Sequence, residues 1–293
     1  MSKVTLGMST YDDFDGVYFS CQGNRLLHPI LDLDGEIIVI DNNPNSSHGA
    51  ATKHFCNKSK FIKYIPFTKY QGTAVRSELF NYSKSEIVIC IDSHVLLAPG
   101  AIDAVVKYLS LEQTDSPILV QGPRLYDNLS HCSLKWLNIW SATMLGKWAP
   151  TIPVDTIGNE AFEIENQGLG AFACRRKEWL GLNPLFRGFG GEEGYIQRKY
   201  QLAGGKVVCI PEFKWIHRFD RPNGIPYRCN LKDRLFNYFL GAFELKLSTD
   251  SIVENFRALL SDFHVRAIFK EALKAYNKSK TDSSLKLDNS GEN

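Results

Sequence analysis

The sequence contains no long apolar run. Nowhere in its 293 residues do about 18 apolar side chains follow one another, so a membrane-spanning helix is not expected. The opening segment, MSKVTLGMST, lacks the basic and then apolar pattern of a secretory signal. Cysteine is limited to seven scattered residues without a C-x-x-C pair, and Cys90 and Cys209 lie inside apolar runs. We therefore expect reduced, partly buried thiols in a cytoplasmic protein, or one of the host-cell cytoplasm if its origin is viral.

A large excess of charge of one sign is also missing. The formal net charge is +2, so the chain as a whole has no field that demands nucleic acid or an anionic membrane as a partner. The sequence shows no internal repeat, and its apolar fraction of 44% is ordinary for a packed globular protein. Its length suits one large domain, or one domain with an appendage.

The first half alternates short apolar runs with segments of helical pattern. This alternation predicts an α/β fold in which helices cover both faces of a parallel sheet. In such sheets ligands bind beyond the carboxyl ends of the strands, and three of those ends are polar here. The expected strands are residues 3–10, 36–41, 60–67 and 86–92, and the expected helices are 15–27, 48–56 and 73–83.

The middle of the chain is less regular. Residues 117–126, 168–176 and 206–219 each read as one strand, and a glycine turn precedes a helix that begins near residue 192. Between them, residues 127–166 carry three tryptophans and no clean periodicity, which predicts a long functional or partly mobile loop.

The pattern changes after about residue 223, where two amphipathic helical segments precede a polar end. We expect a catalytic domain over 1–222, a helical extension over 223–276, and a polar, disordered tail over 277–293.

The triplet Asp92-Ser93-His94 follows a buried strand. On an extended backbone Asp92 and His94 point the same way, and a carboxylate with an imidazole suits a divalent ion such as manganese. Two ligands rarely suffice, so a third must come from elsewhere. The alternative, of about equal weight, is a turn or a helix cap.

Three further features indicate a functional site only when they are taken together, because each has a structural explanation by itself. The segment GFGGEEGY puts glycines before a helix and Glu192 and Glu193 in its first turn, where the helix dipole alone would explain two acids. His217 ends an apolar strand, although a lone histidine is more often structural. Gly72 and Arg76 open a helix, and Arg76 either binds a diphosphate or is an ordinary solvated arginine.

Taken in order, these motifs resemble those of GT-A glycosyltransferases of the family 2 type over residues 3–220, and they match best the catalytic domain of polypeptide N-acetylgalactosaminyltransferases. That family has D-x-H at the end of a central strand, a W-G-G-E-N segment, and a later histidine in G-H-V-F-R. The counterparts here are Asp92-Ser93-His94, the segment 189–193, and the segment 216–219. The resemblance implies a Rossmann-like, mostly parallel central sheet and a C-terminal helical appendage.

The resemblance also implies a ligand set. Asp92, His94 and His217 would hold Mn²⁺ (or Mg²⁺), which bridges the phosphates of a UDP-sugar donor. Glu192 would contact the donor sugar or the acceptor. The remaining nucleotide-sugar contacts that it implies are Thr10, Tyr11, Asp12, Asp41, Gly72, Arg76, Ser93 and Gly191.

The sequence departs from the polypeptide transferases at one position that bears on stereochemistry. Their asparagine is replaced by Glu193, and an acid there is typical of inverting relatives such as the β-1,4-galactosyltransferases, in which it is the general base. The D-S-H triplet, by contrast, resembles that of the retaining polypeptide transferases, but it concerns only the leaving group. We therefore expect transfer to an acceptor hydroxyl, with a slight preference for inversion and with Glu193 as the base.

The acceptor is open: a saccharide, a protein, a small molecule or, as in phage-type DNA-base transferases, a hydroxymethylated pyrimidine. Two basic stretches could touch DNA phosphates, and Trp136, Trp140 and Trp148 could stack on an extruded base. A different class of hypothesis is a non-catalytic module that only binds a nucleotide-sugar. The basic stretches are Lys53, Lys58, Lys60, Lys63, Lys69 and Arg76, and Arg218, Arg221, Arg228, Lys232 and Arg234.

Overall fold

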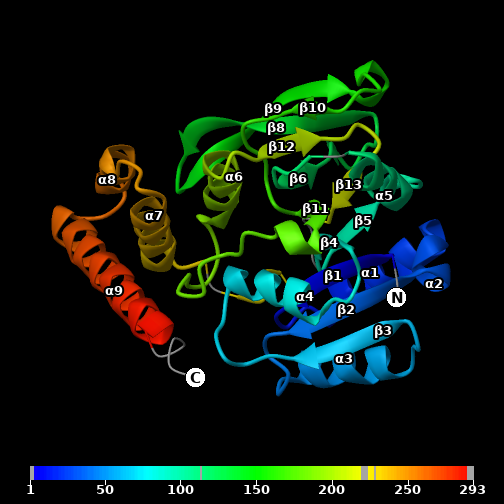
Figure 1. Cartoon of the computed structure of the whole chain (residues 1–293), viewed down its shortest axis with the longest axis horizontal. Helices are drawn as coiled ribbons and strands as arrows, with labels where there is room; N and C mark the ends of the chain where they lie inside the picture. The colour runs from blue at the N-terminus through cyan, green and yellow to red at the C-terminus, as the bar shows by residue number, and fades with distance from the viewer. Residues whose placement is uncertain (1–2, 113, 219–223, 228, 289–293) are drawn as a thin grey trace.

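The computed structural model describes residues 3–112, 114–218, 224–227 and 229–288. Its centre is an eight-stranded sheet in the order β10-β12-β6-β11-β4-β1-β2-β3, of which β11 and β10 run antiparallel to their neighbours (Figure 1). The predicted mixed α/β fold with a mostly parallel central sheet is confirmed. The strands of the N-terminal half are β1 Val4–Thr10, β2 Gly35–Asp41, β3 Ile62–Pro66 and β4 Ile87–Asp92, and those that follow are β6 Ile118–Gln121, β10 Phe162–Glu163, β11 Ala171–Arg175 and β12 Lys206–Cys209.

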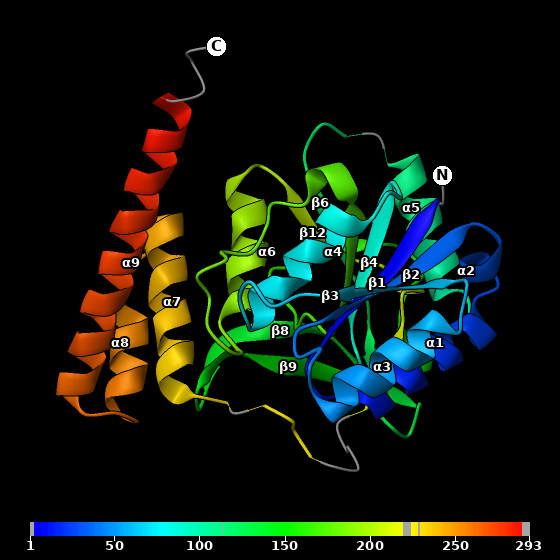
Figure 2. The ribbon, with the colours of Figure 1, turned by 90° about the horizontal axis from the view of Figure 1, so that it is seen from below.

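Helices cover both faces of this sheet because side chains of alternating residues in each strand point to opposite sides. In β4, Ile87, Ile89 and Ile91 belong to the apolar cluster that includes α1 and α5, whereas Val88 and Cys90 belong to the cluster of α4 and α6. Figure 2 shows these layers edge on. The helices are α1 Phe14–Leu27, α2 Ile30–Leu33, α3 Ser47–Asn57, α4 Ser77–Tyr82, α5 Ala101–Leu111 and α6 Glu192–Leu202, and the short 3₁₀ turns are η1 Thr73–Arg76, η2 Val154–Thr156 and η3 Arg176–Glu178.

A second sheet of five strands lies beside the first, in the order β5-β13-β7-β8-β9. It corrects the prediction of a long loop, because most of residues 127–166 form the hairpin of β8 and β9. It also divides two segments that the sequence predicts to be single strands: 117–126 splits into β6 and β7, and 206–219 splits into β12 and β13, with one strand of each pair in each sheet. The bounds are β5 Val95–Leu97, β7 Arg124–Leu125, β8 His131–Ser141, β9 Met144–Pro153 and β13 Trp215–His217.

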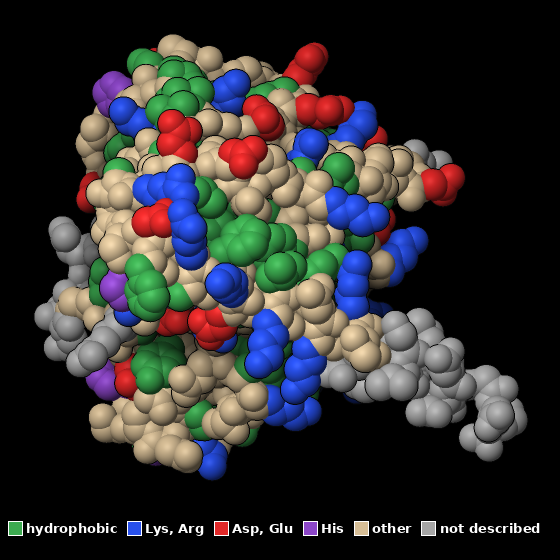
Figure 3. Space-filling view, turned by 90° about the vertical axis from the view of Figure 1, so that its left-hand side faces the viewer, with side chains coloured by type: hydrophobic (Ala, Val, Ile, Leu, Met, Phe, Trp, Pro, Cys, Tyr) green, Lys and Arg blue, Asp and Glu red, His purple; other side chains and the backbone are tan. Residues whose placement is uncertain are grey.

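The C-terminal segment forms α7 Leu231–Leu245, α8 Asp250–Arg257 and α9 Asp262–Asp288, and α9 thus continues into the expected polar tail. Side chains of α7 share one apolar cluster with β11 and α6, so this extension packs directly on the eight-stranded sheet and its helices. Rings of Phe239 and Phe243 in α7 each lie 5.2 Å from that of Phe269 in α9. The face of the molecule on this side carries basic, acidic and apolar side chains intermixed (Figure 3).

The thiols fit the expectation from the sequence: all seven cysteines are free, and six are buried. In the part of the chain that the structure describes, no helix is both long and apolar enough to cross a membrane.

The junction between the two sheets leaves no room for a side chain at Gly122, which lies between β6 and β7. A Cβ on Gly122 would overlap the backbone carbonyl of Phe213, and the Gly122 carbonyl accepts a 2.8 Å hydrogen bond from the Trp215 indole. Gly122→Ala is therefore expected to lower the free energy of unfolding by about 1–3 kcal/mol, measured by urea denaturation. Gly158→Ala, which meets nothing within 4 Å, is the matched control, and an equal loss in both variants would contradict this account.

Candidate active site

Asp92, His94 and His217 converge at the junction of the two sheets. The strand β4 ends at Asp92, the chain turns, and β5 begins at Val95, which pairs with His217 of β13. The His94 and His217 Nε2 atoms are 3.1 Å apart, and the Asp92 Oδ2 lies 3.9 and 3.6 Å from them. One ligand atom from each residue falls within 4.8 Å of the others, so the triplet and the distant histidine are brought together as a possible metal-binding group.

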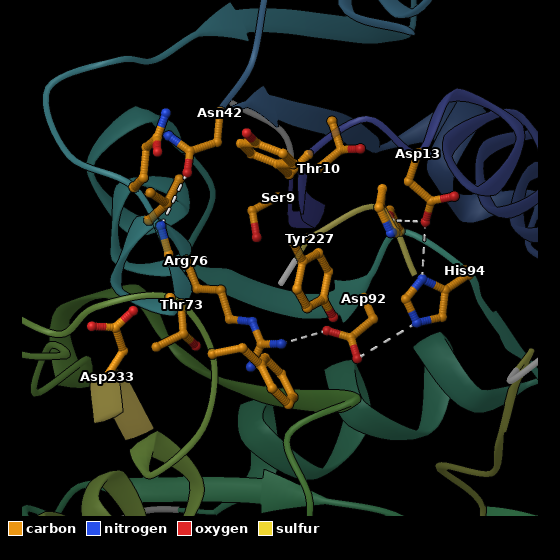
Figure 4. A pocket seen from close by; sticks show the side chains of 18 residues that line it. Ser9, Thr10, Asp13, Asn42, Thr73, Arg76, Asp92, His94, Tyr227 and Asp233 are labelled. Carbon is orange, nitrogen blue, oxygen red and sulfur yellow. Dashed lines mark hydrogen bonds and ion pairs between the residues drawn. The ribbon is translucent and has the colours of Figure 1, made fainter. Parts of the chain in front are cut away.

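A carboxylate behind this group orients His94. The Asp13 Oδ2 lies 3.1 Å from the His94 Nδ1 and accepts a 2.8 Å hydrogen bond from the Ser93 hydroxyl (Figure 4). A carboxylate at Nδ1 fixes the tautomer in which Nε2 keeps its lone pair, as in many histidine–metal sites. The donor set and its support therefore fit a divalent ion, and two imidazoles favour manganese over magnesium.

Arg76 controls the charge of the site. Its Nη2 donates a 2.5 Å hydrogen bond to the Asp92 Oδ1, and its Nη1 lies 3.7 Å from the Glu192 Oε1. Burial alone would raise the pKa of Asp92, but Arg76, together with His217 and His94, holds it well below its usual range. Asp92 is therefore ionised at any physiological pH, as a metal ligand must be. Arg76 is buried and not the solvated helix arginine of the alternative interpretation.

A cavity of about 570 Å³ opens beside these residues at the carboxyl ends of β1, β2 and β4. Of the predicted contacts, Thr10, Tyr11, Gly72, Arg76, Asp92, Ser93 and His94 line it. Gly72 has a φ of 109°, which favours glycine, and a Cβ there would meet the Gly188 backbone. This contact joins the loop before η1 to the glycine loop before α6, so both loops form one wall of the cavity.

Two predicted uridine contacts lie outside the cavity wall, and each is replaced by its neighbour. Asp41 is 1% exposed and accepts a 2.7 Å hydrogen bond from the Tyr64 hydroxyl, whereas Asn42 lines the cavity. Asp12 accepts hydrogen bonds from the Asn43 amide, whereas Asp13 lines the cavity. The assignment of Asp12 and Asp41 to the uridine site is thus not supported by their positions.

Several lining residues were not assigned to the site by sequence reasoning, and most of them come from segments with no chemical motif. These residues are Ser9, Asn42, Asp13, Gln71, Thr73, Val75, Gly188, Phe189, Pro226, Tyr227 and Asp233. Ser9 and Asn42 had a signal, since each stands in a polar strand end, and Gly188 and Phe189 lie in the glycine segment that the sequence singles out for its two acids. Tyr227 projects into the middle of the cavity in Figure 4, between Asp92 on one side and Ser9 and Thr10, at the end of β1, on the other.

Residues 24–164 match the family model named Glycosyl transferase family 2. The fold resembles a crystal structure of GalNAc-T7 with UDP, GalNAc and Mn²⁺ at a TM-score of 0.64, with 17% identity over 84% of this chain and 49% of that one. The chain has a GT-A fold, and residues 24–164 resemble the family 2 glycosyltransferases.

Two other solved structures share the fold. Residues 1–349 of TarS from S. aureus, in complex with UDP-GlcNAc, align at a TM-score of 0.55 with 11% identity, covering 94% of this chain and 80% of that one. The mannosyltransferase PcManGT from Pyrobaculum calidifontis, with GDP-Man and Mn²⁺, aligns at 0.53 with 13% identity over 97% and 80%. The chain spans only about half the length of the GalNAc-T7 chain. No curated protein sequence matches it significantly.

Glu192 and Glu193 lie in the first turn of α6 and are not among the residues that line the cavity. Glu192 is fully buried, and its Oε2 accepts a 2.9 Å hydrogen bond from the Gly190 amide. Burial, followed by the charge of Glu192, raises the pKa of Glu193 to about 8. Gly191, predicted to contact the donor, caps α6 with a φ of 93° and packs against Asn237 of α7.

The three tryptophans of the expected acceptor loop lie in the β8–β9 hairpin and pack against protein groups. Trp136 is 6% exposed and contacts Trp148 edge to face, and Trp148 in turn contacts Trp215. Trp140 packs against Tyr238 and Phe256 of the C-terminal helices. In this arrangement the indole rings contribute to the packing of the second sheet and of the extension, and they do not line the cavity.

Proposed function

We propose that this protein is a glycosyltransferase that moves a sugar from a UDP-sugar to an acceptor hydroxyl with a divalent metal, Mn²⁺ or Mg²⁺. The observation that carries the proposal is the Asp92–His94–His217 group, of which Asp92 and His94 line a cavity at the carboxyl ends of β1, β2 and β4. Solved structures of the same fold contain UDP, UDP-GlcNAc and Mn²⁺, which supports this donor and this ion.

When bound, the ion would neutralise the negative charge that develops on the leaving UDP. The residues around it have separate tasks. Asp13 holds His94 with its Nε2 toward His217, and Arg76 keeps Asp92 ionised and adds a positive charge on the diphosphate side. Tyr11 offers an aromatic ring to the nucleoside at the far side of the cavity. The Asn42 amide holds the loop beside it, donating to the Phe67 and Tyr70 carbonyls and accepting from the Gly72 amide.

Glu193 is the proposed base that takes the proton of the acceptor hydroxyl, with inversion at the anomeric carbon. Its carboxyl is 6% exposed in the absence of an acceptor. It lies within electrostatic range of Arg234 and Tyr238 on α7, and these two residues contact Thr143 and Leu145 of the β8–β9 hairpin. The acceptor is therefore proposed to approach between the hairpin and α7, on the side of Glu193 away from the nucleoside.

The acceptor class is less constrained than the donor. A hydroxymethylated pyrimidine in DNA is supported by the exposed lysines of α3, β3 and the loops that flank β3. The tryptophans support it less, because Trp136 is buried and Trp140 and Trp148 are half-buried against other aromatic rings. In the second basic stretch Arg234 is buried, and Arg221 and Arg228 lie outside the described residues. The proposal is therefore limited to a hydroxyl, which a saccharide, a protein, a small molecule or such a pyrimidine would supply. The exposed lysines are Lys53, Lys58, Lys60, Lys63 and Lys69.

Release of UDP from UDP-sugars tests both the proposed donor and the metal. We expect release that requires Mn²⁺, that EDTA abolishes, and that a suitable acceptor accelerates, measured by a coupled UDP assay and by mass spectrometry of the products. The acceptor panel includes oligonucleotides with hydroxymethylated pyrimidines. Binding of UDP-sugars without any metal-dependent release would support the non-catalytic binding module instead.

A further inference from the structure

Helix α7 brings a carboxylate into the donor cavity. Asn230 caps the helix by accepting a 2.9 Å hydrogen bond from the Lys232 amide, and the first turn places Asp233 in the cavity wall. Asp233 lies beside Gly188, since a Cβ on that glycine would be 3.8 Å from the Asp233 Oδ2. Figure 4 shows Asp233 next to Thr73 and across the cavity from Asp13 and His94.

The position of Asp233 is fixed by its own helix. One turn later, the fully buried Asn237 accepts a 2.7 Å hydrogen bond from the Arg187 amide and donates to the carbonyls of Arg187, at 2.7 Å, and Gly190, at 2.9 Å. Arg234 donates to the Thr143 hydroxyl. These contacts attach α7 to the glycine loop that precedes Glu192, so Asp233 and the proposed catalytic acids move as one unit.

The chemistry of the cavity wall divides into three parts. Polar and aromatic groups at the ends of β1 and β2 face the proposed nucleoside site, and the metal group with Arg76 faces the proposed diphosphate site. The third part consists of Asp233, Thr73, Gly188 and Phe189, and it contributes one anionic group. An ionised carboxylate only accepts hydrogen bonds and repels phosphate, so it suits a neutral ligand that is rich in hydroxyl donors.

We propose that Asp233 accepts hydrogen bonds from hydroxyl groups of the transferred sugar and so selects the donor. This inference rests on the proposed function, because it requires a sugar-nucleotide in the cavity. The C-terminal extension would then be part of the donor site. Helix α7 would supply the residue that binds the sugar, and the N-terminal strands would bind the nucleotide.

The test compares Asp233→Ala and Asp233→Asn with the wild type on UDP-glucose, UDP-galactose and UDP-N-acetylglucosamine, all with Mn²⁺. Asp103→Ala is the matched control, because Asp103 is also an acid in the first turn of a helix but is exposed on α5. We expect the KM of the preferred donor to rise about 10- to 100-fold in Asp233→Ala, and less in Asp233→Asn, because a hydrogen bond to a charged group is lost. The preference between the three sugars should shrink.

Inhibition by UDP alone separates recognition of the sugar from a structural role. UDP lacks the sugar, so its inhibition constant should change by less than about 2-fold in both Asp233 variants. Unchanged KM and unchanged sugar preference would overturn the assignment of Asp233, as would an equal loss of affinity for UDP and for the donors. Failure of the wild type to turn over any UDP-sugar with Mn²⁺ would instead refute the proposed function, and the inference with it.

Discussion

His217→Ala is expected to lower the affinity for Mn²⁺ and to reduce metal-dependent UDP release by about 100- to 10,000-fold, because it removes one of three ligands from the leaving-group site. The same loss is expected for His94→Ala. The ring of His217 is partly exposed and ends a short strand of the second sheet, so the fold should survive the truncation. Titration of Mn²⁺ followed by electron paramagnetic resonance measures binding without any need for activity.

Asp92→Ala should reduce metal-dependent UDP release by a similar factor, but the result of this substitution is harder to interpret. Removal of this carboxylate leaves Arg76 buried beside Glu192 alone, and breaking a buried ion pair costs about 3–5 kcal/mol. The histidine variants therefore test the metal site. Asp92→Ala tests whether loss of the Asp92 carboxylate also lowers the free energy of unfolding. His264→Ala, which alters an exposed histidine of α9, is the control. Near-normal Mn²⁺ binding and turnover in both histidine variants would exclude the metal assignment.

The alternation of strands and helices in the first half was predictable because buried parallel strands are continuous apolar runs, and each is separated from the next by an amphipathic helix. The β8–β9 hairpin was not predictable by the same route. Leu137 and Ile139 are apolar yet 42% and 47% exposed, so the period of two that marks a half-buried strand is hidden. A register shift between Leu137 and Trp140 further disrupts the pattern.

The candidate metal group was predictable for a local reason, whereas the rest of the cavity was not. Asp92 and His94 stand two residues apart after a strand, so their common direction follows from backbone geometry. At the ends of β1 and β2, successive side chains point in different directions. A prediction that is wrong by one residue therefore selects a side chain that points away from the cavity. Asp12 has a φ of 51°, which turns the chain so that Asp13 lines the cavity, and Asp41 as the last residue of β2 points to Tyr64 while Asn42 lines the cavity.

The proposed stereochemistry of transfer depends on Glu193 as the base. Glu193→Gln is therefore the second substitution that we expect to have a large effect on the rate of transfer. The amide keeps the shape of the side chain but cannot take a proton, so transfer to the acceptor should fall about 100- to 10,000-fold. Affinity for UDP-sugar with Mn²⁺ should be nearly unchanged, because the metal group and Arg76 are intact. Glu192→Gln is the comparison, since it removes the charge next to Arg76 and should weaken donor binding as well.

The pH dependence of transfer gives an independent view of the same carboxyl. Burial and the charge of Glu192 raise the pKa of Glu193 to about 8, while Arg76 and Arg234 oppose the shift. A base acts only in its ionised form, so kcat/KM of the wild type should rise with pH, pass its midpoint near pH 8 and level off above that value. A raised pKa means that the neutral acid predominates below this value, and the loss of activity therefore lies on the acid side.

In Glu193→Gln this rise should disappear from the residual activity, because the titrating group is gone, whereas Glu192→Gln should shift the rise to lower pH by removing a neighbouring negative charge. Proton NMR of the first-formed product identifies the anomer, and inversion is expected. Full transfer by Glu193→Gln together with a retained anomeric configuration would contradict the role of Glu193 as base. Such a result would place this chain mechanistically with the retaining relatives that its Asp92-Ser93-His94 triplet resembles, and it would leave Glu193 as a buried acid whose task is to hold the start of α6.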